Sequence, residues 1–128
     1  MNKKLDAVKE FHNAFGLGIL DSPKAFLGKD KIQLRFNLME EENEEYIEAA
    51  MNDDLVEVAD ALGDMLYILC GTILEHGMQH KIVEVFEEIQ RSNMSKLGAD
   101  GKPIYREDGK VMKGPNYFKP DIEKILSK

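Results

Sequence analysis

The sequence predicts an all-α protein. Apolar residues recur at intervals of three and four positions in four separate stretches, the spacing that places them on one side of a helix. Turn-forming residues separate these stretches, and alternation typical of a strand is confined to one short segment near the C-terminus. With 128 residues, 43% of them hydrophobic, the chain has the size of one domain with a modest core. We therefore expect a bundle of four to five helices.

The first helix is expected over residues 5–15. Leu5, Val8 and Phe11 form its apolar side, and Gly16 is the residue type that most easily adopts the backbone conformation that ends a helix. A loop containing Pro23 should then lead to the second helix.

The second and third helices are expected over residues 30–51 and 54–75. Leu34 and Leu38 lie on the apolar side of the second helix. Asp53 or Asp54 can cap the third, because a carboxylate there accepts hydrogen bonds from free backbone N–H groups. Gly77 should follow its end.

The fourth helix is expected over residues 80–96, with Ile82, Val85 and Ile89 as its packing side. Asp100-Gly101 and Asp108-Gly109 then mark turns, so we expect a loop or small hairpin followed by a short helix over residues 121–126. The prediction is one domain over residues 1–128, with a helical core at about 3–97 and a structured tail at about 98–128.

Charge and composition exclude several classes of function. A net charge of -7 disfavours a nucleic-acid partner or an anionic membrane, since both require a positive face. Cys70 is the only cysteine, so it cannot form a disulfide within the chain and is expected in the core. The N-terminal residues are too polar for a signal peptide, and no apolar run approaches the roughly 18 residues of a membrane span. We expect a cytoplasmic protein.

Two acidic strips are the most informative feature. Residues 40–45 hold five carboxylates, and Glu42 and Glu45 project from one side of a helix. Acidic runs are usually solvated, and we expect Glu40, Glu44 and Glu48 to be so. Glu57, Asp60 and Asp64 share one strip of the next helix and stand among apolar residues. Carboxylates brought together in this way repel each other unless a cation binds them, and oxygen ligands suit Mg²⁺, with Mn²⁺ as an alternative ion.

The order of these acids resembles a known pattern. Glu41-Glu42-x-x-Glu45 followed by Glu57-x-x-Asp60, together with the segment Arg91-Ser92-Asn93-Met94-Ser95-Lys96, is similar to the MazG-type all-α nucleoside triphosphate pyrophosphohydrolases. That superfamily also includes dimeric dUTPases and phosphoribosyl-ATP pyrophosphohydrolase. The resemblance extends over residues 11–120, with a tail like that of a bacterial and phage branch. It implies a MazG-like bundle that hydrolyses a nucleoside triphosphate, expected to be a deoxynucleotide, to the monophosphate and pyrophosphate using Mg²⁺, as nucleotide-pool house-cleaning.

The resemblance also implies residue roles. Glu41 would be the base that activates water, and the metal ligands would be Glu42, Glu45, Glu57 and Asp60. Many relatives carry a Glu at the position of Ala61, so Asp64 lacks its usual companion and would be either an extra ligand or a hydrogen-bond acceptor behind the ligands. The residues expected to bind the substrate are Asn93, Lys96, Arg91, Arg106, Lys110 and Lys113.

Three alternatives remain open. Glu40-Glu41-x-x-Glu44 fits the same acidic pattern, although Tyr46 favours the register ending at Glu45, because relatives place a large apolar residue there. The activity could be that of a phosphoribosyl-ATP pyrophosphohydrolase, or the chain could be a non-catalytic helical module that binds Mg-nucleotide. A helical set this short should leave apolar surface that favours a homodimer or homotetramer.

Overall fold

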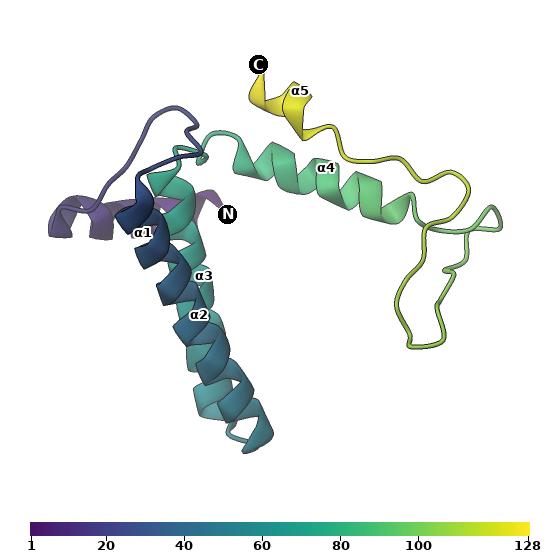
Figure 1. Cartoon of the computed structure of the whole chain (residues 1–128), viewed down its shortest axis with the longest axis horizontal. Helices are drawn as coiled ribbons and strands as arrows, with labels where there is room; N and C mark the ends of the chain where they lie inside the picture. The colour runs from purple at the N-terminus through teal and green to yellow at the C-terminus, as the bar shows by residue number, and fades with distance from the viewer. The chain divides into compact units, whose positions relative to one another are not determined.

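The computed structural model describes residues 1–128 and contains five helices (Figure 1). They are α1 (Asn2–Phe15), α2 (Lys29–Met51), α3 (Leu55–Glu75), α4 (Ile82–Met94) and α5 (Ile122–Leu126). The all-α prediction is confirmed, and none of the helices combines the length and hydrophobicity needed to cross a bilayer. The chain forms two compact units, Met1–His80 and Lys81–Lys128. The expected helical core is divided between them, and the single domain expected from the sequence stays a prediction.

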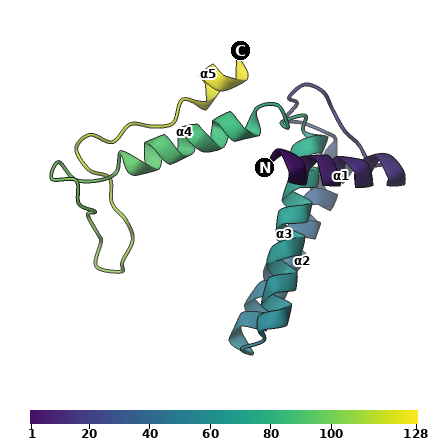
Figure 2. The same ribbon diagram turned by 180° about the vertical axis from the view of Figure 1, so that it is seen from behind.

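In the first unit, α2 and α3 run antiparallel, side by side, from a tight turn (Figures 1 and 2). Asp53 in this turn has a φ of 54°, in the left-handed region that Asp tolerates better than most residues. The Asp54 side chain accepts a hydrogen bond from the backbone N–H of Glu57, at 3.2 Å, and so caps α3. The turn therefore starts α3 directly beside the end of α2.

Helix α1 lies across α3 in both views of the ribbon (Figures 1 and 2). Leu5 and Val8 of α1 are buried, as are Cys70 and Leu74 of α3. Cys70 is fully enclosed, which confirms that it is a core residue. Burying these apolar side chains stabilises the three-helix unit.

The loop between α1 and α2 is tied to the end of α3. The backbone N–H of Leu20 donates to the carbonyl of Leu74 at 3.0 Å, and that of Lys24 donates to the carbonyl of His76 at 2.9 Å. These bonds satisfy carbonyl groups near the end of the helix, which have no partners within it. The loop thereby fixes where α2 begins.

The second unit combines α4, α5 and the segment between them. The Ser92 hydroxyl donates to the carbonyl of Phe118 at 2.8 Å, and the backbone N–H of Asp121 donates to Glu88 Oε2 at 2.7 Å. The expected hairpin is reduced to one antiparallel bridge between Tyr105 and Val111. The tail is therefore ordered by contacts with α4 more than by strand pairing.

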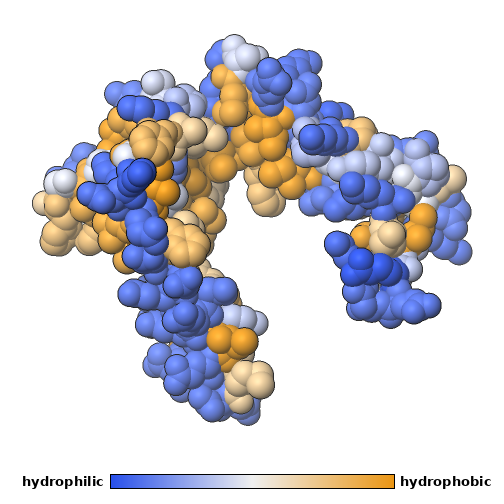
Figure 3. Space-filling model, in the orientation of Figure 1, coloured by the Kyte–Doolittle hydropathy of each residue, from blue (hydrophilic) through white to orange (hydrophobic).

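Large apolar side chains remain exposed on the first unit, where orange patches interrupt the hydrophilic surface (Figure 3). On α3, Leu62, Leu66 and Leu69 follow one another at helical spacing and are 50%, 37% and 46% exposed. A contiguous apolar stripe of this kind is typical of a surface that another protein surface covers.

Candidate metal centre

Three carboxylates converge midway along the α2–α3 pair. Glu42 and Glu45 come from α2 and Asp64 comes from α3, and one oxygen of each lies within 4.8 Å of the others. Glu42 and Glu45 are one helical turn apart, and the antiparallel partner brings Asp64 opposite them. We call Glu42, Glu45 and Asp64 the carboxylate triad.

The triad changes the proton affinity of its most enclosed member. The pKa of Glu42 is raised to about 7, first because burial disfavours its charged form and then because its carboxyl shares a hydrogen bond with Glu45. The negative charges of Glu45, Asp64 and Asp60 raise the pKa further. Protonation and cation binding are thus two competing ways to relieve the same repulsion.

The triad fits a divalent cation. Glu42 Oε2 is buried and has no hydrogen-bond partner, so a lone pair is free for an ion. The neighbouring oxygens of Glu45 and Asp64 supply two further hard ligands, and Mg²⁺ is usually held by a few carboxylates together with water and substrate phosphates. Exposed carboxylates commonly exist without an ion, but the unpaired oxygen of Glu42 distinguishes this group.

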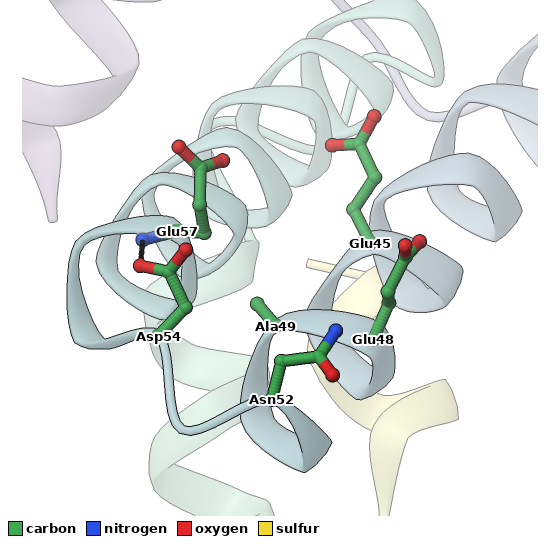
Figure 4. Close-up of a pocket in the computed structure, with 6 residues that line it drawn as sticks. All are labelled: Glu45, Glu48, Ala49, Asn52, Asp54 and Glu57. Atoms are coloured by element: carbon green, nitrogen blue, oxygen red, sulfur yellow. Dashed lines mark hydrogen bonds between the residues drawn. The ribbon is translucent and has the colours of Figure 1, made fainter.

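The other two expected ligands lie beside the triad. Asp60 is exposed, one turn before Asp64, and its charge acts on Glu42. Glu57 is nearer the turn and lines a groove of about 290 Å³, whose other lining residues are Glu45, Glu48, Ala49, Asn52 and Asp54. Figure 4 shows the Glu45 and Glu57 carboxylates projecting to the same side of the two helices. The five acids therefore form one continuous strip between α2 and α3.

The sequence ranked Glu57 and Asp60 ahead of Asp64, whereas in the structure it is Asp64 that clusters with Glu42 and Glu45. A signal for this arrangement exists in the chain. Glu42 and Asp64 are equally distant in sequence from Asp53, the centre of the turn. In a regular antiparallel pair, such residues lie opposite each other.

The acids flanking the triad stand apart from it. Glu41 is exposed on α2, adjacent to Glu42, and Glu40 and Glu44 are exposed as well. Glu42 and Glu45, the two acids of α2 in the triad, belong to the pattern Glu41-Glu42-x-x-Glu45 and not to Glu40-Glu41-x-x-Glu44. The Glu41 side chain is therefore accessible to water, and it follows directly before Glu42 in the sequence.

The residues expected to bind the substrate all belong to the second unit. Asn93 is exposed on α4, and Lys96, just beyond this helix, is partly buried. Arg91 pairs with Glu88 at 2.9 Å and lies 4.8 Å from the centre of the Phe118 ring. Asn93 is therefore open to a ligand and Lys96 is partly accessible, while Arg91 already has partners.

The three expected substrate-binding residues of the tail also have local contacts. Arg106 pairs with Asp108, and the backbone N–H of Lys110 donates to the same carboxylate at 3.1 Å. The ammonium of Lys113 lies 4.7 Å from the centre of the Tyr117 ring. These contacts order the tail around its turn at residues 107–109 and keep its charges near the surface.

Comparison with known proteins identifies relatives of this arrangement. The family model described as phosphoribosyl-ATP pyrophosphohydrolase matches residues 8–93, which include α2, α3 and every acid of the strip. Among solved structures, the chain is similar to a protein from Exiguobacterium sp. 255-15 that is described as a candidate NTP pyrophosphohydrolase. It is 28% identical, with a TM-score of 0.54, and the alignment covers 97% of this chain and 94% of that one. The comparison with curated proteins gives no match.

Proposed function

Since the chain belongs to the phosphoribosyl-ATP pyrophosphohydrolase family and is therefore a pyrophosphohydrolase of the MazG-like all-α superfamily, we propose that it hydrolyses a nucleoside triphosphate in a Mg²⁺-dependent reaction. The products would be the monophosphate and pyrophosphate, and a deoxynucleoside triphosphate is the preferred substrate class. The observation that carries this proposal is the carboxylate triad with its unpaired Glu42 oxygen.

The charge of the site accounts for the metal requirement. A triphosphate carries about four negative charges, so a strip of carboxylates repels it at short range. Glu42, Glu45 and Asp64 would hold the ion, and Asp60 and Glu57 would complete the ligand set. An ion held there would supply Lewis acidity, which would offset the charge that develops on the leaving pyrophosphate. Mn²⁺ meets the same oxygen-ligand preference.

Glu41 is the proposed general base. Its exposed carboxylate would orient a water molecule and accept its proton as the water oxygen attacks the α-phosphorus. The bond between the α-phosphorus and its bridging oxygen then breaks, and pyrophosphate leaves with that bonding pair. Asn93 and Lys96 are proposed to bind sugar and phosphate oxygens, with Arg91, Arg106, Lys110 and Lys113 as further cations.

The exposed stripe of Leu62, Leu66 and Leu69 supports a homodimer or homotetramer as the working form. Four-helix cores bury apolar stripes of this kind. In this chain α1 and α2 both pack on α3, yet the stripe of α3 stays exposed to solvent. We propose self-association as part of the same function, which is the removal of unwanted nucleotides from the cellular pool.

A pyrophosphate-release screen tests the proposal. The purified chain would be assayed against all canonical and several damaged nucleoside triphosphates, with Mg²⁺, with Mn²⁺ and with a chelator. We expect release that requires the metal and varies with the base or sugar. A flat profile independent of metal would contradict the proposal, and nucleotide binding without turnover would indicate a non-catalytic module.

A second substrate is favoured by the family match itself. The matching family model is described as phosphoribosyl-ATP pyrophosphohydrolase, whose reaction has the same bond cleavage on a different nucleotide. Including phosphoribosyl-ATP in the screen separates the two candidates by their kcat/KM values. A preference for it over every nucleoside triphosphate would establish this alternative.

A further inference from the structure

A buried ion pair lies on the first unit at the end of the α2–α3 pair away from the turn. Arg35 of α2 is 7% exposed and Glu75 of α3 is 6% exposed, with Arg35 Nε 3.3 Å from Glu75 Oε2. Taking two charges out of water is costly, and apolar residues of the same volume often stabilise a core equally well. The pair is therefore a poor source of stability, and its geometry points to another role.

The guanidinium of Arg35 makes two directed contacts with α3. Its Nε donates to the hydroxyl of Thr72 at 3.0 Å, and its Nη2 donates to the backbone carbonyl of Ile68 at 2.8 Å. The carbonyl of Ile68 is part of the α3 backbone, so no side-chain rotation of Ile68 can move it. A hydrogen bond to this carbonyl therefore ties Arg35 to one position along the axis of α3. The planar fork of arginine supplies both donors in a rigid arrangement.

A glycine makes this close approach feasible. A Cβ atom added at Gly71 would lie 2.7 Å from Arg35 Nη2 and 2.8 Å from Nε2 of the buried His12. Glycine is a poor helix former, so its presence within α3 indicates a need for space. Arg35 and Gly71 are equally distant from Asp53 in sequence, as are Glu42 and Asp64. The two contacts thus belong to one register of the helix pair.

We propose that Arg35 is a positioning residue that sets the register of α2 against α3 and thereby holds Glu42 and Glu45 opposite Asp64. Glu42 lies two helical turns beyond Arg35 on the same side of α2, and Asp64 lies one turn before Ile68 on α3. A slip of one turn, about 5.4 Å, would carry the carboxylates past one another. Carboxylates that lie within 4.8 Å of one another repel when no metal is bound, so the triad favours such a displacement and the Arg35 contacts oppose it.

This inference rests on the proposed function, because the register matters to the site only if the triad binds an ion. The direct test is the substitution Arg35→Lys, which keeps the positive charge near Glu75. A lysine ammonium is a single point donor and does not reproduce the fork that reaches Thr72 and Ile68 together. The matched control is Lys31→Met, which removes a half-exposed cation that lies 3.8 Å from the other oxygen of Glu75.

Mn²⁺ is the probe. Its dissociation constant would be measured by electron paramagnetic resonance on the metal-free protein, below the melting temperature of every variant. We expect about tenfold weaker Mn²⁺ binding in Arg35→Lys and less than a twofold change in Lys31→Met. With saturating metal, kcat should fall in Arg35→Lys while KM stays within twofold. Unchanged Mn²⁺ binding and kcat in a folded Arg35→Lys variant would overturn the inference and leave the proposed function intact.

A double substitution separates positioning from stability. Arg35→Met with Glu75→Met removes both buried charges, so thermal stability should be close to wild type while Mn²⁺ binding stays weak. Recovery of melting temperature and Mn²⁺ affinity together would show that Arg35 acts through stability alone and would overturn the inference. A wild-type protein that binds no Mn²⁺ would overturn both this inference and the proposed function.

Discussion

Glu42 of α2 and Asp64 of α3 present carboxylate oxygens within 4.8 Å of each other, although a turn and much of two helices separate them in the chain. Two such groups repel one another when both are ionised. The pKa of Glu42 is raised first by burial, then by its interactions with Glu45, and then by the charges of Asp64 and Asp60. The pair thus stores unfavourable energy in the metal-free protein, which a bound cation or proton relieves.

Asp64→Asn should have opposite effects with and without metal. Removing one charge of the triad relieves repulsion, so the melting temperature of the metal-free protein should rise. Losing a ligand should weaken Mg²⁺ binding by about tenfold, or about 1.4 kcal/mol. Thermal melting with and without Mg²⁺ and titration calorimetry measure the two effects. The control Glu44→Gln, an exposed acid of α2, should leave Mg²⁺ binding unchanged, and an equal loss in both variants would argue against the triad.

The stability of the metal-free protein should fall as pH rises from about 5 to 8. The folded pKa of Glu42, about 7, lies above its ordinary value of 4.5, so the folded state binds more protons than the unfolded state between these values. Stability is therefore greater below this window and is lost as Glu42 ionises. Mg²⁺ binding, which competes with the proton, should strengthen over the same range.

Melting curves at several pH values, with and without Mg²⁺, measure this dependence. Glu42→Gln carries no ionisable group at the critical position and should flatten the pH profile of the metal-free protein. A wild-type profile as flat as that of the variant would contradict the assignment.

Glu41→Gln should separate binding from catalysis. The amide cannot accept a proton from water, so kcat should fall by about 10²–10⁴-fold, the usual contribution of a general base. Glu41 is outside the triad, so the Mg²⁺ dissociation constant should change little. Steady-state pyrophosphate release and calorimetry on the same preparation provide both values. Loss of metal binding in this variant would instead assign Glu41 as a ligand.

Leu66→Glu should weaken self-association. Leu66 lies in the middle of the exposed apolar stripe of α3, and a charge there would have to be buried in any interface formed by that stripe. Light scattering after size exclusion should show a wild-type oligomer and a smaller species for the variant. Gln33→Glu adds the same charge at an exposed polar position of α2 and should leave the molecular mass unchanged.

Ser92→Ala should loosen the tail. Ser92 is 2% exposed and donates to the carbonyl of Phe118, so its loss should cost about 1 kcal/mol and leave that carbonyl without this partner. Amide hydrogen exchange should become faster around residues 117–121, while α4 itself stays protected. Gln90→Ala, at an exposed position of α4, serves as the control and should not change exchange in the tail.

Local signals predicted most of the helices. Gly16 adopts the left-handed conformation that ends α1, and Asp54 accepts the capping bond of α3, as the sequence indicated. For the segment after Gly98 the sequence left a loop or a small hairpin open, and the structure shows a loop with one antiparallel bridge. A short pairing depends on contacts beyond the turn, and here the segment that follows it is bound to Ser92 and Glu88 of α4.

The sequence by itself determined the helices, their caps and the two acidic strips, because periodicity and capping depend on residues a few positions apart. It also predicted that a cation binds between these strips. Tertiary structure alone decided that Asp64 meets Glu42 and Glu45, that one Glu42 oxygen is left without a hydrogen-bond partner, and that Arg35 is buried against Glu75. These features depend on the register of α2 against α3, which is set by contacts between residues far apart in the chain, such as Arg35 with Ile68.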